Sequence, residues 1–374
     1  MRLAYLSTDP GIAYGGTKGA SVHVQELATA LAEAGAEVLL VVASCTRDAP
    51  PPPAGVTIEV LPGPGKGTTT SERLRAEHQR AAWLEERLGR FAADILYERL
   101  ALHSAAGSVA AQALHIAHVV ELNAPLLAEA ERYRRLDFRE EAERLEQAVL
   151  TDADVVLAVS RPLAAYARSR GACRVEVLPN AVSASSVRVR RRDHDPPVAV
   201  FSGSLRPWHG IDSIAEAWAR LGDEAPELLV IGDGPGRALL EAVGARVTGP
   251  VPHAEVPDYL AGADIGLAPY ARDAPDYFSP LKLFEYLAAG LATVAADLPG
   301  VRDVVSEDSA VVVPQGDAPA LADAVAMLAA DRDLRRRLGE AGSALVAAHH
   351  TWQHRAQSVL ALASRAPTRV EAGV

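Results

Sequence analysis

Short aliphatic runs that alternate with amphipathic helical segments dominate this sequence. Leu3–Leu6 comes first, a glycine-containing loop and a helical segment follow, and Val38–Val42 is the next run. Between Val24 and Leu31 apolar residues recur at i, i+3, i+4 and i+7, the spacing of one buried helix face. A run that is aliphatic throughout is typical of a strand with helices on both faces. The pattern predicts βαβ units, and therefore the α/β fold class.

The alternation occurs in two series. Further strand-like runs lie at 94–97, 119–122 and 154–159, and then at 198–201, 228–231, 265–267, 293–295 and 311–313. Helical patterns in the second series fall at 211–221, 280–289, 317–330 and 333–348. The segment between the series is polar, with a basic run at 188–192 and the pair Pro196-Pro197, as in a linker. We predict two doubly wound, Rossmann-like parallel-sheet domains, residues 1–182 and 183–352.

Composition narrows the class of protein. Hydrophobic residues make up 49% and charged residues 23%, as in ordinary globular domains. The net charge of −11 opposes binding to nucleic acid or anionic lipid, and two cysteines are too few for a disulfide framework. No apolar run approaches the roughly 18–20 residues of a membrane span. We expect a cytoplasmic protein with at most peripheral membrane contact. The basic group Arg132, Arg134, Arg135 and Arg139 could contact anionic lipid or an acidic acceptor, although such a group is more often a solvated face.

Loops that follow strands are the candidate binding sites, because parallel sheets bind ligands at the carboxyl ends of their strands. The pair Gly15-Gly16 would let backbone approach a phosphate, or would simply form a turn. Loop 203–210 contains Gly203 and Arg206, whose guanidinium is suited to a diphosphate; the alternative is an ordinary surface arginine.

Residues Ser279–Gly290 form a second candidate site. Ser279 is a favourable N-cap and Pro280 a favourable first helical residue, so the helix would present its positive end and Lys282 to an anion. Phe284 belongs to the predicted core stripe, with Leu281 and Ala288, and this leaves Lys282 and Glu285 on the opposite face. The alternative for that pair is a simple helical ion pair.

Other motifs are weaker. The run Gly232-Asp233-Gly234-Pro235-Gly236 resembles a dinucleotide fingerprint, but its spacing and the lack of an acidic residue after the next strand disfavour a nicotinamide cofactor. We identify no metal-binding pattern and no P-loop, and we expect neither a cofactor nor a catalytic metal.

These loops together resemble the GT-B glycosyltransferases of family 4 over nearly the whole chain. The matching motifs are Gly15-Gly16 with His23 to Gly35, Leu178 to Val182, Gly232 to Pro235, Gly249 with Val251, and the helix at 280–289 with Gly290. The resemblance implies a retaining, metal-independent transfer of a hexose-type sugar from a nucleotide-sugar donor to an acceptor hydroxyl. The donor would be UDP-, GDP- or dTDP-linked, and the acceptor would be a small molecule, a glycan or a lipid-linked compound. It also implies that residues 353–374 return to the first domain.

The resemblance assigns roles to individual residues. In the second domain Glu285 would hold the donor ribose, while Arg206 and Lys282 would stabilise the departing diphosphate. The remaining donor-binding candidates are Gly15, Gly16, Gly203, Gly234, Val251, Ser279, Pro280 and Leu281. Arg99 stands near the position of the family's catalytic histidine, and the acceptor-side candidates are His23, Glu98, His103, Glu121 and Asn123.

Three positions depart from the family pattern. Tyr277 replaces the usual first glutamate, Ser204 replaces an arginine, and His209 replaces a lysine. These departures favour an alternative in which the protein binds a nucleotide sugar with little or no turnover. A GT-B epimerase or phosphorylase is a further alternative, although we identify no lysine suited to the phosphorylase cofactor.

Overall fold

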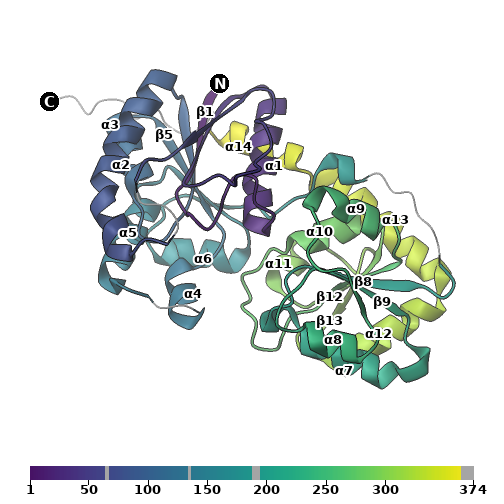
Figure 1. Ribbon diagram of the computed structural model, residues 1–374. Helices are drawn as coiled ribbons and strands as arrows, with labels where there is room; N and C mark the ends of the chain where they lie inside the picture. Colours follow the sequence, from purple (N-terminus) through teal and green to yellow (C-terminus); the bar gives the residue numbers. More distant parts are fainter. Residues whose placement is uncertain (64–66, 134–135, 188–193, 364–374) are drawn as a thin grey trace. The chain divides into compact units, whose positions relative to one another are not determined.

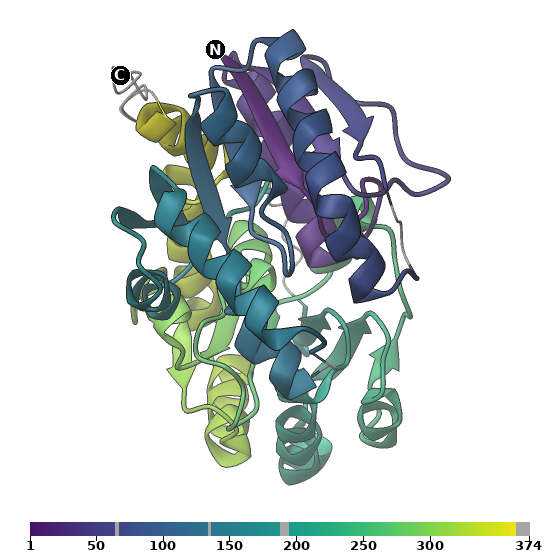
Figure 2. The same cartoon turned by 90° about the vertical axis from the view of Figure 1, so that its left-hand side faces the viewer.

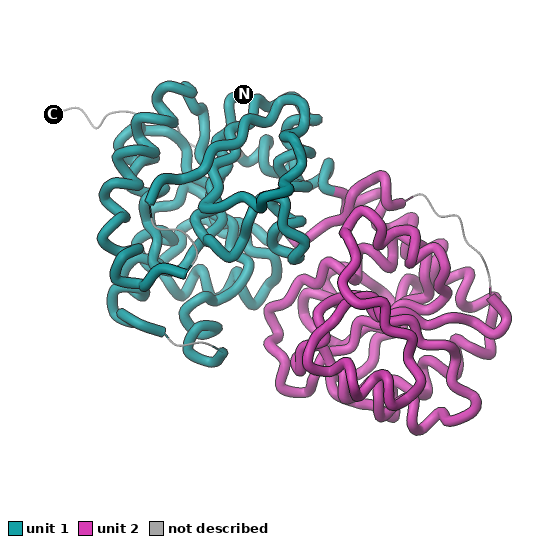
Figure 3. Tube along the Cα trace, in the orientation of Figure 1, with its two compact units in different colours: residues 1–178, 352–374 teal, residues 179–351 magenta. Residues whose placement is uncertain are grey.

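The computed structural model describes residues 1–63, 67–133, 136–187 and 194–363. The chain divides into two compact units, residues 1–178 with 352–374 and residues 179–351 (Figure 3). The predicted boundaries at 182/183 and 352/353 are therefore displaced by a few residues. The predicted linker run 188–192, residues 364–374 of the predicted C-terminal return, and Arg134 with Arg135 lie outside the described residues.

Unit 1 is built on a seven-stranded parallel sheet (Figure 1). Its order is β3 (Val56–Val60), β2 (Glu37–Val42), β1 (Arg2–Ser7), β4 (Ile95–Arg99), β5 (Ala117–Leu122), β6 (Val155–Ala158) and β7 (Val175–Val177). The helices are α1 (Gly19–Glu33), α2 (Thr70–Phe91), α3 (Ala106–Ala113), α4 (Leu126–Tyr133), α5 (Arg139–Asp152), α6 (Arg161–Ser169) and α14 (Trp352–Ala363). The chain builds strands to one side of β1 and then to the other, so the predicted doubly wound topology is confirmed.

Helices cover both faces of this sheet, and the terminal helix α14 belongs to unit 1 (Figure 2). Leu6 and Leu96 pack with Leu84 of α2 and Ala110 of α3 on one face. The helices α1 and α14 pack against each other, and the rings of His23 and Trp352 lie 4.7 Å apart. A segment distant in sequence therefore completes the first unit.

Unit 2 is built on a six-stranded parallel sheet with the same doubly wound order. Its strands run β10 (Arg246–Val247), β9 (Glu227–Ile231), β8 (Val198–Ser202), β11 (Ile265–Ala268), β12 (Ala292–Ala296) and β13 (Val311–Val313). The helices are α7 (Ile211–Leu221), α8 (Arg237–Ala242), α9 (Val256–Leu260), α10 (Leu281–Ala288), α11 (Pro299–Arg302), α12 (Ala318–Ala330) and α13 (Arg332–His349). Each strand run predicted from residues 198–313 lies within a strand of the structure.

Two surface features bear on membrane contact. Within the described ranges, no helix has the length and apolar character needed to traverse a bilayer. Arg139 of the basic group pairs with Glu131 and Glu143, at nitrogen–oxygen distances of 2.5 and 3.0 Å.

A buried histidine–glutamate contact lies on the face of the unit 1 sheet that α3 covers. The imidazole Nε2 of His118 on β5 lies 2.8 Å from the Glu98 carboxylate on β4, and both side chains are almost fully buried. Gly107 of α3 leaves the space that this carboxylate occupies, because a Cβ atom there would lie 2.2 Å from Glu98 Oε2.

Replacing Gly107 by alanine should therefore lower the free energy of unfolding by about 1–3 kcal/mol, the usual cost of overpacking a core. Gly89→Ala, within helix α2, is the matched control. A Cβ atom there would lie 3.6 Å from its nearest neighbour, Leu114, which is an ordinary contact distance. The control should be neutral or stabilising by up to about 1 kcal/mol. Urea unfolding compares the two, and equal stabilities would contradict this account.

Candidate functional site

The site in unit 2 lies where the sheet changes its winding direction, between β8 and β11. At such a switch point the loops after the two strands diverge and leave a crevice for a ligand. The loop after β8 contains Gly203 and Arg206, and the segment after β11 leads into helix α10. Both segments that sequence analysis selected in this domain therefore follow the two strands at this point.

The start of α10 differs from the prediction. The helix begins at Leu281 with Pro280 as its N-cap, and Pro280 has extended dihedrals. The Ser279 hydroxyl instead accepts a hydrogen bond from the Asn180 backbone N–H at 3.0 Å, and the Ser279 carbonyl accepts from Asn180 Nδ2 at 2.6 Å. The N–H groups of Leu281 and Lys282 have no partner within the described ranges, so the helix still presents donors at its positive end.

Lys282 is buried, which contradicts its predicted place on an open helix face opposite the core. Its side chain is 8% exposed, and Nζ lies 3.9 Å from the centre of the Phe201 ring with no hydrogen-bond partner among the described residues. Burial lowers the pKa of Lys282 to about 7, although the negative charge of Glu285 opposes this shift. Leu281, predicted as a core residue, is instead partly exposed.

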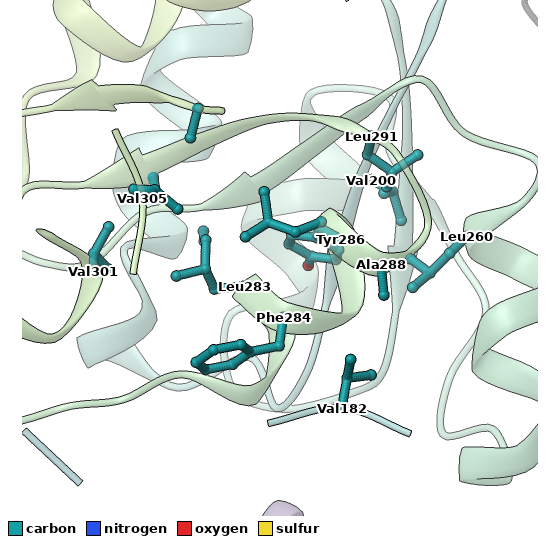
Figure 4. Packing of buried hydrophobic residues seen from close by; sticks show 14 of the residues in the cluster. Val182, Val200, Leu260, Leu283, Phe284, Tyr286, Ala288, Leu291, Val301 and Val305 are labelled. Atoms are coloured by element: carbon teal, nitrogen blue, oxygen red, sulfur yellow. The ribbon is translucent and has the colours of Figure 1, made fainter. Parts of the chain in front are cut away.

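The packing of Tyr286 explains this orientation of α10. Its ring lies against Gly266 of β11, where a Cβ atom would approach to 2.7 Å. Its hydroxyl accepts a hydrogen bond from the Ser202 backbone N–H at 2.6 Å, and Leu283 and Val200 belong to the same apolar cluster (Figure 4). With Tyr286 fixed beneath the end of β8, Lys282 one turn earlier is directed inward.

Glycines let the loops after β8 and β9 approach closely above Lys282. Gly203 has φ +137°, and a Cβ atom there would lie 3.2 Å from Lys282 Nζ. A Cβ atom on Gly232 would clash with the Gly203 carbonyl, and one on Gly234 would clash with the Leu205 backbone. The Gly234 N–H is already donated to Asp233 Oδ1 at 2.8 Å, so Gly234 serves close packing here.

The rest of the β8 loop presents one exposed cation. Arg206 is exposed and lies over the Trp208 ring at 5.9 Å. His209 is directed inward, and its Nδ1 lies 2.5 Å from the Ser204 carbonyl. Burial, followed by the charge of Lys282, lowers the pKa of His209 to about 3, so the imidazole is neutral and cannot replace the lysine of the family pattern.

Glu285 lines an open, solvent-connected pocket in unit 2. Its Oε1 lies 3.1 Å from His253 Nε2, so the predicted alternative, an ion pair with Lys282, does not form. The other lining residues are mostly apolar and come from η1 (Ala184–Val187), α9 and α10; they are Val182, Ser185, Ser186, Val256, Pro257, Leu260, Ala261 and Ala289. Val251 is half-buried against the core of this unit.

In unit 1 the glycine pair is not the open phosphate cradle that was expected. The Gly15 N–H donates to Gln25 Oε1 at 3.0 Å and the Gly16 N–H donates to the Ala13 carbonyl at 3.1 Å. Neither amide is therefore available to a phosphate in this structure. Both glycines are required sterically, because a Cβ atom would lie 2.3 Å from Thr46 Oγ1 at Gly15 and 2.7 Å from Ser21 Oγ at Gly16.

Three of the predicted catalytic and acceptor-side residues gather around a fourth, Glu121. Its carboxylate accepts from Arg99 Nη1 at 2.5 Å and lies 2.8 Å from His23 Nε2. It also accepts from Asn123 Nδ2 and from the Tyr97 hydroxyl, which sequence analysis missed. Burial raises the pKa of Glu121, but His23 and Arg99 outweigh it and hold that pKa well below its usual range.

Glu98 and His103 do not join this cluster. Successive strand residues point to opposite faces, so Glu98 is directed away from Arg99 and is buried against His118. Glu98 therefore lies on the opposite face of the sheet from the other acceptor-side candidates at Glu121. His103 has its Nε2 2.9 Å from the Asp137 carbonyl, and burial lowers its pKa.

No group of three or more histidine, cysteine, aspartate or glutamate side chains among the described residues is placed to hold a metal ion.

Each of the two units matches the profile of a known protein family. Residues 17–186 match the profile described as Glycosyltransferase Family 4, and residues 196–331 match the one described as Glycosyl transferases group 1. The chain belongs to the family 4 glycosyltransferases with the GT-B fold. The predicted family and fold are confirmed, and the protein is a transferase.

Individual relatives are distant. The chain is 28% identical over 244 residues to the Bacillus subtilis glycosyltransferase TuaC, covering 62% of this chain and 60% of that protein. It is 27% identical to the D-inositol 3-phosphate glycosyltransferase of Xylanimonas cellulosilytica, over 95% of this chain and 93% of the relative. Sucrose-phosphate synthase from Thermosynechococcus elongatus has the same fold, with a TM-score of 0.77, 19% identity and coverage of 97% and 98%.

Replacing Glu121 by glutamine tests the cluster in this glycosyltransferase. The change leaves the buried Arg99 guanidinium without its carboxylate, so the free energy of unfolding at neutral pH should fall by about 3–5 kcal/mol. Because folding lowers the pKa of Glu121, its contribution is complete above an unfolded-state pKa of about 4.3 and is lost as the pH falls below that value. Urea unfolding should therefore show a smaller difference from wild type at about pH 3.5 than at about pH 7.

Glu176→Gln is the control, because it removes an exposed carboxylate 3.7 Å from Arg174. Its effect should stay within about 0.5 kcal/mol. An equally small effect of Glu121→Gln would contradict the proposed importance of the buried carboxylate.

Proposed function

We propose that this glycosyltransferase moves a hexose-type sugar from a nucleoside diphosphate donor to an acceptor hydroxyl, with retention of configuration and without a catalytic metal. Unit 2 binds the donor and unit 1 binds the acceptor. The observation that carries the proposal is the buried Lys282 ammonium beneath Gly203, which has no hydrogen-bond partner in the part of the chain that the structure describes. A buried cation without a partner is costly, and a diphosphate would supply the missing negative charge.

The chemistry follows from the charges around this position. Negative charge develops on the diphosphate as the glycosidic bond breaks, and groups held in place beforehand stabilise it most effectively. Three groups of unit 2 would provide such stabilisation. They are the Lys282 ammonium, the N–H groups at the start of α10 that have no partner among the described residues, and the exposed guanidinium of Arg206. The Glu285 carboxylate can accept hydrogen bonds from the two ribose hydroxyls, since only one of its oxygens contacts His253.

Solved structures of the same fold support a nucleotide-sugar donor. The Anabaena protein HepE was solved with UDP and glucose; its TM-score is 0.72 at 15% identity, over 97% of this chain and 99% of that one. We propose a nucleotide-sugar donor, for which this neighbour supports a UDP-linked sugar. GDP- and dTDP-linked donors remain part of the proposal through the family resemblance alone. The acceptor would be a small molecule, a glycan or a lipid-linked glycan.

The competing function is a nucleotide-sugar-binding protein with little or no turnover. The neutral His209 in place of a lysine favours it. Lys282 offsets that loss, because its ammonium lies close enough to His209 to depress the imidazole pKa. The enzyme is therefore the better supported of the two.

Release of nucleoside diphosphate from a panel of nucleotide sugars separates these functions. Turnover should persist in excess EDTA, and Arg206→Ala or Lys282→Gln should each lower it by about 10²–10³-fold. The exposed Arg246→Ala, whose guanidinium pairs with Glu227, is the matched control and should keep wild-type turnover. Unchanged turnover in both site variants would contradict the mechanism, and loss of turnover in EDTA would contradict metal independence.

The pH dependence of UDP binding tests Lys282 directly. Because the anion binds the ammonium form, affinity should be constant below about pH 7 and fall by up to tenfold per unit above it. Calorimetry between about pH 6 and about pH 9 measures this profile. Lys282→Gln should bind more weakly and lack the alkaline decline, and it also controls for titration of the nucleotide phosphate. The same decline in both proteins would show that Lys282 is not the titrating group.

A further inference from the structure

Three residues lie in one row across the carboxyl edge of the unit 1 sheet. Ser7 of β1 is in register with Arg99 of β4, and Arg99 is in register with Glu121 of β5. The sheet changes its winding direction between β1 and β4, so this row crosses the switch point of unit 1. That is the position at which open parallel sheets leave space for a ligand.

The Glu121 carboxylate in this row already accepts as many hydrogen bonds as its two oxygens can take. Glu121 Oε1 contacts Arg99 and Asn123, and Oε2 contacts His23 and Tyr97. With four donors on its two oxygens, Glu121 fixes the surrounding side chains and cannot also serve as the acceptor for a substrate hydroxyl.

Arg99 and two hydroxyl groups remain available. Arg99 is 9% exposed, and within the described ranges Glu121 Oε1 is its only hydrogen-bond partner, although a guanidinium carries five N–H groups. The hydroxyls of Ser7 and Tyr5 are buried and without a partner among the described residues. Tyr5 belongs to the same face, since it is in register with Tyr97 and the two rings lie 4.9 Å apart.

The guanidinium of Arg99 and the hydroxyls of Tyr5 and Ser7, which keep unused donors among the described residues, can therefore all donate hydrogen bonds to a ligand. Buried polar groups in native proteins are normally paired, so an unpaired set at a switch point indicates a ligand. The two hydroxyls can donate or accept, but Arg99 can only donate, so the group that binds the guanidinium must be an acceptor, and an anion also balances its charge. Phosphate and carboxylate groups only accept, and arginine is especially suited to them.

We propose that Tyr5, Ser7 and Arg99 form an oxyanion subsite that binds a phosphate or carboxylate group of the acceptor substrate. Glu121 is the positioning residue that orients Arg99. The acceptor would then be a hydroxyl compound that carries an acidic group. Assigning the anion to the acceptor rests on the proposed function, whereas the existence of the subsite can be tested without turnover.

The test is thermal unfolding of the full chain titrated with inorganic phosphate and, separately, with acetate. An anion that binds only the folded protein raises the midpoint, and the larger response identifies phosphate or carboxylate as the preferred group. Ser7→Ala and Arg99→Lys should each weaken the response about tenfold or more, the loss expected for one charge-assisted hydrogen bond. Arg99→Lys keeps a cation beside Glu121 but lacks the planar fork of donors.

Two variants locate the anion. Ser108→Ala is the matched control for Ser7→Ala, because Ser108 is equally buried but lies on α3, where it contacts Asp152. Ser108→Ala should keep the wild-type response. Lys282→Gln removes phosphate binding at the proposed donor site and should keep the component of the response that Ser7→Ala weakens. A response that disappears in Lys282→Gln belongs to the donor site and overturns the subsite.

Absence of any response in the wild type, or a response unchanged in Ser7→Ala, also overturns the proposal. Circular dichroism establishes folding of each variant, and the uncharged Ser7→Ala decides the question if Arg99→Lys does not fold. Failure of the proposed function would appear separately, as missing UDP binding or missing turnover, and would leave the anion response intact.

Discussion

Burial of helix α10 against the second sheet is the constraint on which the proposed donor site depends. Tyr286 occupies the space left by Gly266 and accepts a hydrogen bond from the end of β8, so the helix cannot rotate without breaking both contacts. This packing holds Lys282 in an apolar environment over Phe201. The free energy lost by desolvating an ammonium group can be recovered when an anion binds, and the proposed donor site rests on this effect.

Unit 1 uses the opposite arrangement at the equivalent place in its sheet. There a buried carboxylate, Glu121, is satisfied by four donors, and the cation beside it keeps unused capacity. Both sites follow from topology, since each lies where a doubly wound sheet changes direction and the loops on either side diverge. The two units therefore present two cationic sites on equivalent scaffolds, one on helix α10 and one on strand β4.

Sequence patterns predicted the strands and most helices well, because a strand buried on both faces must be aliphatic and a packed helix must repeat its apolar residues. These patterns failed where one residue type can serve two purposes, as when a glycine either exposes a backbone amide to a ligand or only allows close packing. The spacing of Gly15 and Gly16 does not reveal that Gln25 and the Ala13 carbonyl occupy their amides. Helical periodicity predicted an exposed Lys282, because the apolar stripe marks only one buried face of the helix. Lys282 is buried on another face.

The amino-acid sequence alone determined the α/β class, the two series of elements, the family, and the choice of Arg99, Glu121, Lys282 and Glu285 as residues to examine. These follow from local periodicity and from motifs contiguous in the chain. Tertiary structure decided which of those residues meet. Strand register brought Ser7 beside Arg99 and strand alternation turned Glu98 away from it, while the packing of Tyr286 decided the burial of Lys282. Such contacts join residues far apart in sequence, so no local pattern contains them.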